Sequence, residues 1–218
     1  MRKAIILLVL LAVIVAVFLL FYDGGNRSGQ TVQGLPWHIE ILPGGASRVF
    51  GITLGVSTLA DAARLLGDGE VAIVVNDDQD YGLEMFFARY TAGVFSGKLI
   101  LVADLPADRL EQLVERAGRR KYLESGGKKY TPGSADIPDI MKAAVTSVTF
   151  LPAVSLDEET AIQRFGVPAE TVVTGEQQIH LLYPEKGLDV IINRDGREIL
   201  QYVAPKSFSF LRAPLHPQ

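Results

Sequence analysis

Few residues of this chain have the types and the spacing that catalysis or metal binding requires. The sequence holds three histidines, His38, His180 and His216, and no cysteine. No two histidines stand at the spacing of metal ligands, and a chain without cysteine has no thiol nucleophile. No serine lies in a G-x-S-x-G context. We therefore expect no catalytic residue, no metal site and no cofactor, and we expect that the protein is not an enzyme.

One acidic stretch, NDDQDYGLE, offers oxygen ligands at alternate positions. Asn76, Asp78 and Asp80 precede Gly82 in this stretch. An EF-hand loop needs glycine at its sixth position and glutamate at its twelfth. Here the glycine is seventh and the twelfth residue is Phe87, so the pattern favours a solvated hairpin loop. A weak calcium site within 76–80 stays open as the alternative.

Cations are concentrated in one part of an otherwise acidic chain of net charge −4. Such a cluster suits an anionic partner, which could be lipid head groups, a glycan polymer or an acidic protein. It is also typical of a solvated helix end, where cations are favourable. The acidic balance disfavours nucleic acid as a partner. The candidate anion contacts are Arg116, Arg119, Arg120, Lys121, Lys128 and Lys129.

The N-terminal part predicts a membrane anchor. Residues 4–21, AIILLVLLAVIVAVFLLF, contain no charged or polar side chain. A helix of this length measures about 27 Å, close to the hydrocarbon thickness of a bilayer. Arg2 and Lys3 precede the run, which places the N-terminus in the cytoplasm, and bulky residues stand where a signal peptidase needs small ones. We predict an uncleaved single-pass anchor in the cell inner membrane, with the rest of the chain in the periplasm or the extracytoplasmic space.

The remaining sequence predicts an internal duplication, in which one small structural unit occurs twice in tandem. STLADAARLLG and SLDEETAIQRFG each indicate a capped helix that ends at a glycine, and strand patterns follow both. An offset of 99 residues matches Gly67 with Gly166 and Pro106 with Pro205. The predicted fold class is α+β: an N-terminal transmembrane helix followed by two tandem helix-plus-antiparallel-meander units with a helical linker. The predicted boundaries are 1–22 for the anchor, 23–36 for a flexible linker, 37–106 for the first repeat, 107–146 for the helical linker, 147–205 for the second repeat and 206–218 for a tail.

Strand alternation separates an apolar face from a mixed face in each unit. In GLEMFFAR the apolar face holds Leu83, Met85 and Phe87, and in GLDVIINR it holds Leu188, Val190 and Ile192. The mixed faces carry one large apolar residue each, Phe86 and Ile191. A large apolar residue among polar ones on a broad face resembles an interface anchor. Phe86 and Ile191 are therefore the candidate contacts with a partner.

The second unit also carries a recognisable pattern. Its helix ends in Phe165-Gly166-Val167-Pro168, and a strand with Leu182 and Tyr183 precedes a strand and turn with Leu188, Val190 and Gly196. This pattern resembles the SmpA/OmlA (BamE-like) envelope family, whose fold is shared with the tandem units of β-lactamase inhibitory proteins. The resemblance implies a protein-interaction or envelope-assembly module that binds another envelope protein. A ligand-binding or sensory ectodomain that captures a small molecule between the two repeats is the alternative.

Overall fold

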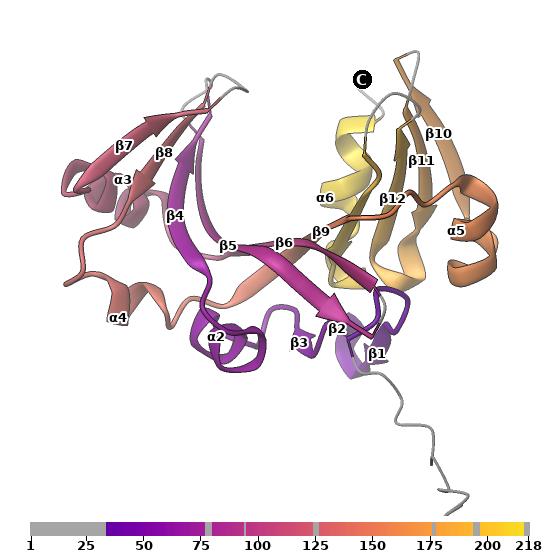
Figure 1. Cartoon of the computed structure of the whole chain (residues 1–218), viewed down its shortest axis with the longest axis horizontal. Coiled ribbons are helices and arrows are strands. Elements are labelled where there is room, and N and C mark those ends of the chain that lie inside the picture. Colours follow the sequence, from indigo (N-terminus) through magenta and orange to yellow (C-terminus); the bar gives the residue numbers. More distant parts are fainter. Residues whose placement is uncertain are drawn as a thin grey trace, which may run out of the picture. The chain divides into compact units, whose positions relative to one another are not determined.

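The computed structural model describes residues 34–76, 80–93, 95–123, 127–175, 178–193 and 197–215. These residues belong to one compact unit, which begins at Gln33. Figure 1 shows strands as its main elements, with short helices between them.

One antiparallel sheet of ten strands organises the described residues, in the order β10-β11-β12-β13-β9-β6-β5-β4-β8-β7. A separate sheet holds the short strands β1, β2 and β3. The strands of the large sheet are β4 (Glu70–Val75), β5 (Tyr81–Ala92), β6 (Phe95–Ala103), β7 (Arg119–Tyr122), β8 (Lys128–Thr131), β9 (Val145–Pro152), β10 (Glu170–Thr174), β11 (Gln178–Tyr183), β12 (Leu188–Asn193) and β13 (Ile199–Val203). Those of the small sheet are β1 (Glu40–Leu42), β2 (Ala46–Val49) and β3 (Ile52–Thr53).

The helices are short. In α2 and α5, the residues that cap the two ends explain where each helix begins and ends. Thr58 and Asp61 form a reciprocal capping box at the start of α2, and Asp157 accepts a hydrogen bond from the Thr160 backbone N–H at the start of α5. Both helices stop at a glycine with positive φ, Gly67 and Gly166. The helices are α2 (Leu59–Leu66), α3 (Ala107–Glu115), α4 (Ile137–Ile140), α5 (Glu158–Phe165) and α6 (Ser209–Arg212).

The main core lies on one face of the large sheet. Helices α2 to α5 and the segment around Val49 to Leu54 bury their apolar residues in it. The predicted apolar faces lie here, because Leu83, Met85, Leu188 and Val190 are at most 1% exposed. A second, smaller cluster lies elsewhere and joins Leu182 and Val203 to Phe208 of the C-terminal segment.

The predicted fold class is wrong in its architecture. Instead of two meander units joined by a helical linker, the strands form one continuous sheet, because β6 pairs with β9 along most of its length. The predicted linker 107–146 also contains the hairpin β7–β8, which pairs with β4 and extends the sheet. The predicted tail, 206–218, folds as far as Leu215 into the 3₁₀ turns η3 (Pro205–Ser207) and η4 (Ala213–Leu215) and the helix α6.

The relation between the two predicted copies is partial. Helices α2 and α5 stand 99 residues apart and have the same length, and β4 and β10 follow them at matching positions. Three strands of the sheet follow α2 before the next helix, whereas four follow α5. The duplication itself stays a prediction.

The predicted membrane anchor needs a correction as well. Among the described residues, no helix is long and apolar enough to cross a membrane. The run 4–21 that led to the prediction lies outside the described residues. The structure therefore supports neither the predicted transmembrane helix nor the single-pass location in the inner membrane.

Candidate functional site

The middle of the large sheet has one face that no core cluster covers. Strand register places Phe86 beside Ile100 and Ile100 beside Thr149, so these three side chains leave the sheet on the same side. In the same way, Glu84 lies beside Val102 and Val102 lies beside Ser147, so these side chains leave the sheet on that side too. We call this surface the open face and define it by Glu84 and Phe86 of β5, Ile100 and Val102 of β6, and Ser147 and Thr149 of β9.

Burial separates the open face from the core face of the same strands. The six open-face residues are all half-buried. None of them belongs to either hydrophobic cluster. Among their neighbours along the strands, Met85, Leu101 and Val148 point the other way and are at most 1% exposed. The sheet therefore has a packed side and an unpacked side at β5, β6 and β9.

The same side of the sheet is covered farther along. Val203 of β13 pairs with Ser147 of β9, which places it on the side of the open face. Here the C-terminal segment 205–215 packs against the sheet. Its apolar residues Phe208, Leu211 and Leu215 lie against Val172, Leu182 and Val203. One half of this side thus has a cover supplied by the chain itself, and the open face lies beyond it.

The structure treats the two predicted partner contacts differently. Phe86 lies on the open face with part of its ring exposed. Ile191 lies on the same side of the sheet but is only 7% exposed, in the half that carries the C-terminal segment. Sequence alternation placed it on the mixed face correctly, yet a buried side chain cannot anchor a partner. Ile191 is therefore not part of the candidate site.

Charged groups surround Phe86. The Lys129 ammonium lies 5.9 Å from the centre of the Phe86 ring and 2.9 Å from a carboxylate oxygen of Glu70. Burial raises the pKa of Glu84, and the charge of Lys129 acts in the opposite direction. A shallow pocket of about 180 Å³ lies between these groups. Phe86 is thus an aromatic side chain flanked by both signs of charge.

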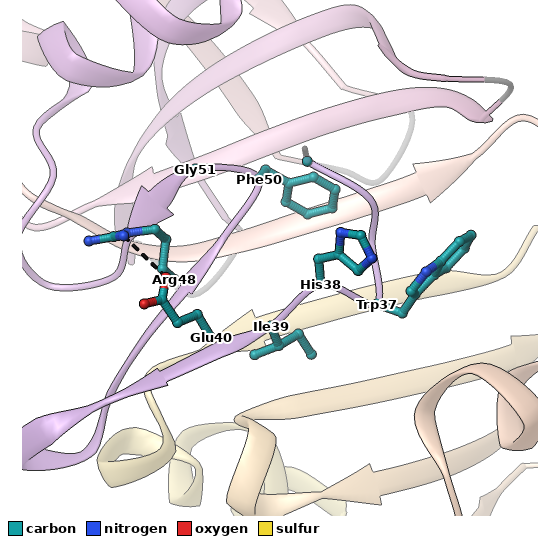
Figure 2. Close-up of a pocket in the computed structure, with 8 residues that line it drawn as sticks. Trp37, His38, Ile39, Glu40, Arg48, Phe50 and Gly51 are labelled. Atoms are coloured by element: carbon teal, nitrogen blue, oxygen red, sulfur yellow. Dashed lines mark hydrogen bonds and ion pairs between the residues drawn. The ribbon is translucent and has the colours of Figure 1, made fainter. Parts of the chain in front are cut away.

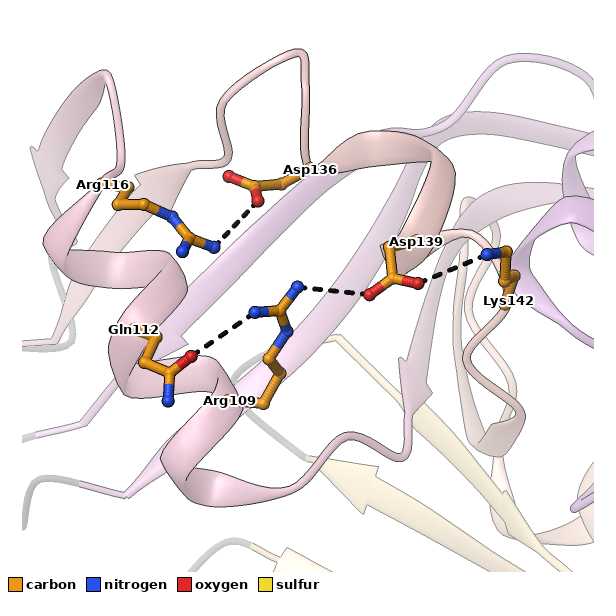
Figure 3. Close-up of polar contacts among 6 residues, drawn as sticks. All are labelled: Arg109, Gln112, Arg116, Asp136, Asp139 and Lys142. Carbon is orange, nitrogen blue, oxygen red and sulfur yellow. Dashed lines mark hydrogen bonds and ion pairs between the residues drawn. The ribbon is translucent and has the colours of Figure 1, made fainter.

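The six candidate anion contacts do not form one site. Arg116 caps the end of α3 and donates to Asp136 at 2.9 Å, and nearby Arg109 donates to Asp139 at 3.3 Å (Figure 3). Lys142 reaches the other oxygen of Asp139 at 3.4 Å. These contacts join α3 to the segment that contains α4, so the role the structure gives Arg116 is structural.

The remaining five cations lie on one hairpin. Arg119, Arg120 and Lys121 are exposed on β7, and Lys128 and Lys129 are half-buried on β8. Lys129 is occupied by Glu70, and Arg120 stacks over the Tyr122 ring at 5.2 Å. The spacing in sequence did not reveal a hairpin, because the two strands are short and have no apolar alternation. The contact with an anion stays a prediction.

A larger pocket lies in the N-terminal segment of the described chain. It measures about 610 Å³ and is lined by residues between Gly34 and Gly51. Figure 2 shows His38, Trp37 and Phe50 around it, with the ion pair Glu40–Arg48 of 3.1 Å at one side. Tyr90 and Tyr202 hold this segment by donating to the carbonyl oxygens of Gly34 and Pro36, at 2.7 and 3.0 Å. Sequence analysis did not identify this pocket.

A buried polar network links three strands. His180 Nδ1 lies 2.8 Å from Asp189 Oδ2, and its Nε2 lies 3.1 Å from Thr174 Oγ1. His180 is 6% exposed and Asp189 is 1% exposed, and Asp189 Oδ1 has no hydrogen-bond partner among the described atoms. Burial raises the pKa of Asp189, although the contact with His180 opposes the shift. The expected strand position of His180 is correct, but its pairing with Asp189 depended on the β11–β12 register.

Two predictions concern metals. Within the described ranges, no group of three or more metal-binding side chains comes together. Asn76 and Asp80 bond each other, with the Asp80 backbone N–H donating to Asn76 Oδ1 at 2.8 Å. Residues 77–79 of the candidate calcium loop lie outside the described residues, so the calcium alternative stays a prediction.

Comparisons of the chain with protein-family models, with curated proteins and with solved structures gave no match. The candidate site therefore stands on its geometry alone.

Proposed function

We propose that this protein is a protein-interaction module and that it binds its partner on the open face. The observation that carries the proposal is the unequal cover of one side of a continuous sheet. At β10 to β13 the segment 205–215 packs on that side, whereas Phe86, Ile100 and Val102 have no such cover among the described residues. Apolar side chains on an uncovered sheet face are suited to burial by another protein.

The composition of the open face favours a protein over a small molecule. It spans three long strands and combines apolar Phe86, Ile100 and Val102 with polar Glu84, Ser147 and Thr149. Interfaces between proteins typically combine a few apolar anchors with a polar surround. The open face offers no paired nucleophile and base, so we propose no reaction there.

Site-specific photo-crosslinking tests this proposal in the cells that make the protein. Benzoylphenylalanine replaces Phe86 in one variant and Phe210 in a matched control, since Phe210 is also a phenylalanine and is 76% exposed on α6. We expect a discrete protein adduct from position 86 that position 210 does not give. Adding Ile100→Asp beside the crosslinker should remove the adduct. The same adducts from both positions, or an adduct unaffected by Ile100→Asp, would contradict the proposal.

The pocket of Figure 2 supports a second candidate function, the binding of a small molecule. Its size is within the range of ligand pockets, and it combines aromatic rings with the Glu40–Arg48 ion pair. It lies in the segment 34–51 and not between the two predicted repeats. Trp37 is the one tryptophan of the chain and lines the pocket, so its fluorescence reports occupancy directly. Anilinonaphthalene sulfonate, an apolar anion, should quench Trp37, and Arg48→Glu should weaken the quenching; an equal effect in both proteins would exclude this candidate.

A further inference from the structure

An open sheet has two edge strands, and here they differ in chemistry. Among the described strands, β7 pairs only with β8 and β10 pairs only with β11. Each edge therefore presents backbone N–H and C=O groups that another strand can use. Proteins commonly protect such edges with charged side chains, lysine above all.

The β7 edge is protected in this way. Its four residues are Arg119, Arg120, Lys121 and Tyr122, and all four are exposed. If two copies paired antiparallel through this strand, Arg120 would lie opposite Lys121 of the second copy. Like charges directly opposite one another destabilise a strand pair. The basic cluster therefore has an explanation that needs no ligand: it prevents self-association at this edge.

The β10 edge lacks this protection. Its sequence is Glu-Thr-Val-Val-Thr, with no cation and with three β-branched residues at its centre. Val173 is 65% exposed, and nearby Val167 is 84% exposed. The charge of Glu170 at its first position is met by Arg212 of α6 at 2.9 Å. After Glu170 the strand is uncharged and β-branched, and an edge of this kind is suited to pairing with a further strand.

We propose that a second copy of this chain pairs antiparallel with β10 and makes a two-fold dimer. With Val172 on the two-fold axis, Thr171 lies opposite the second copy's Val173, and Glu170 lies opposite its Thr174. The two carboxylates then lie at opposite ends of the pair, so no like charges face each other. A two-fold contact uses the same patch on both copies, and β10 meets that condition whereas β7 does not. This inference concerns a different surface from the open face and does not depend on the proposed function.

The length of β10 sets the strength of this dimer. Five residues per strand make a contact smaller than a standard stable interface. The dimer should therefore be weak: the fraction of chains in dimers should increase with protein concentration and fall on dilution. Pairing at an edge leaves the open face of each copy accessible, because its strands β5, β6 and β9 lie in the interior of the sheet.

The test compares two substitutions of equally exposed valines in the full chain, kept in a mild non-ionic detergent. Val173→Lys places a charge on the β10 edge, and Val56→Lys is its control because Val56 is 67% exposed elsewhere. In analytical ultracentrifugation, the average molar mass of the wild type and of Val56→Lys should rise with protein concentration from that of a monomer toward that of a dimer. Val173→Lys should raise the dissociation constant about tenfold or more, because each dimer then carries two ammonium groups on the same face, diagonally across the two-fold axis and within reach of one another. Unchanged far-ultraviolet circular dichroism checks that both variants fold.

A position-specific crosslink separates this dimer from association through any other part of the chain. The chain has no cysteine, so Val172→Cys introduces a single thiol that the two-fold axis brings next to its copy. Directly opposite residues have Cβ atoms about 4.5–5.5 Å apart, close to disulfide geometry. Mild oxidation should give disulfide-linked dimers from Val172→Cys much faster than from Val56→Cys. A monomer at all concentrations, a dimer that Val173→Lys leaves intact, or equal crosslinking at both positions would overturn the inference.

Discussion

The Lys129 ammonium lies 5.9 Å from the centre of the Phe86 ring, on a side of the sheet where Phe86 belongs to no hydrophobic cluster. Lysine and phenylalanine come from strands on either side of β4, so the contact spans three strands. Lys129 is in turn fixed by Glu70 at 2.9 Å. Phe86 therefore lies on an interior strand of the sheet, beside a lysine that an ion pair positions.

The two faces of β6 should respond differently to truncation. Leu101 is fully buried in the core, and its neighbour Ile100 is half-buried on the open face. Leu101→Ala should reduce the free energy of unfolding by about 2–5 kcal/mol, as core truncations do. Ile100→Ala should cost clearly less, since it leaves no closed cavity. Urea unfolding of both variants checks this, and equal losses would mean that the open face is packed.

The Glu84 carboxyl should make stability depend on pH. Burial raises its pKa in the folded state, so its contribution is fully present below the unfolded pKa and is lost as the pH rises through the folded pKa. Glu84→Gln removes the buried charge and should raise the unfolding midpoint at pH 7. The difference from wild type should disappear at acidic pH, where Glu84 is protonated in both states. A midpoint that Glu84→Gln lowers at pH 7 would contradict this assignment.

Tyr90 should weaken the fold at alkaline pH. Burial raises the pKa of Tyr90 to about 12, above the usual value near 10. Because the folded pKa is the higher one, the unfolded chain ionises first and stability is lost as the pH rises from about 10 to about 12. Tyr90→Phe should remove part of this loss, while also weakening the hold on Gly34 at neutral pH. The unfolding midpoints of the wild type and of Tyr90→Phe, measured between pH 8 and pH 12, check this prediction. If both midpoints fall equally with pH, the prediction is wrong.

The His180–Asp189 pair should be costly to break from one side. His180→Ala leaves the buried carboxyl group of Asp189 without this partner, and an unsatisfied buried polar group typically costs about 1–3 kcal/mol. Asp189→Asn should cost less, because it leaves a neutral amide beside the imidazole. The free energy of unfolding of each variant at neutral pH decides the order. A smaller loss for His180→Ala than for Asp189→Asn would show that the buried aspartate is not held by this contact.

Local pattern was enough to predict much of the secondary structure. Strand alternation assigned Leu83, Met85 and Phe87 to the core, and all three are buried. The helix at 59–66 was marked by its N-cap and by Gly67, and the helix at 158–165 by Gly166, although its N-cap is Asp157 and not the expected Ser155. These features depend on residues a few positions apart, which is the distance over which sequence patterns are informative.

Long-range pairing was not predictable in the same way. The junction of β6 with β9 joins Leu101 to Val148, and no local pattern encodes that contact. Because it was missed, one sheet was predicted as two units. The burial of Ile191 was missed for a similar reason, since strand alternation does not show which distant segments return to that side of the sheet. Of the two partner contacts predicted from the sequence, Phe86 therefore belongs to the candidate site and Ile191 does not.

The most direct test of the central claim, that Phe86 belongs to a binding surface and not to the core, measures Phe86→Ala in two assays at once. The partner captured through position 86 is titrated against wild type and variant, and both are unfolded thermally. We expect binding to weaken at least about tenfold, since truncating an interface anchor commonly costs about 2 kcal/mol or more, while the unfolding midpoint stays nearly unchanged. Unaltered binding would contradict the claim, and so would a loss of several kcal/mol in stability, which would place Phe86 in the core.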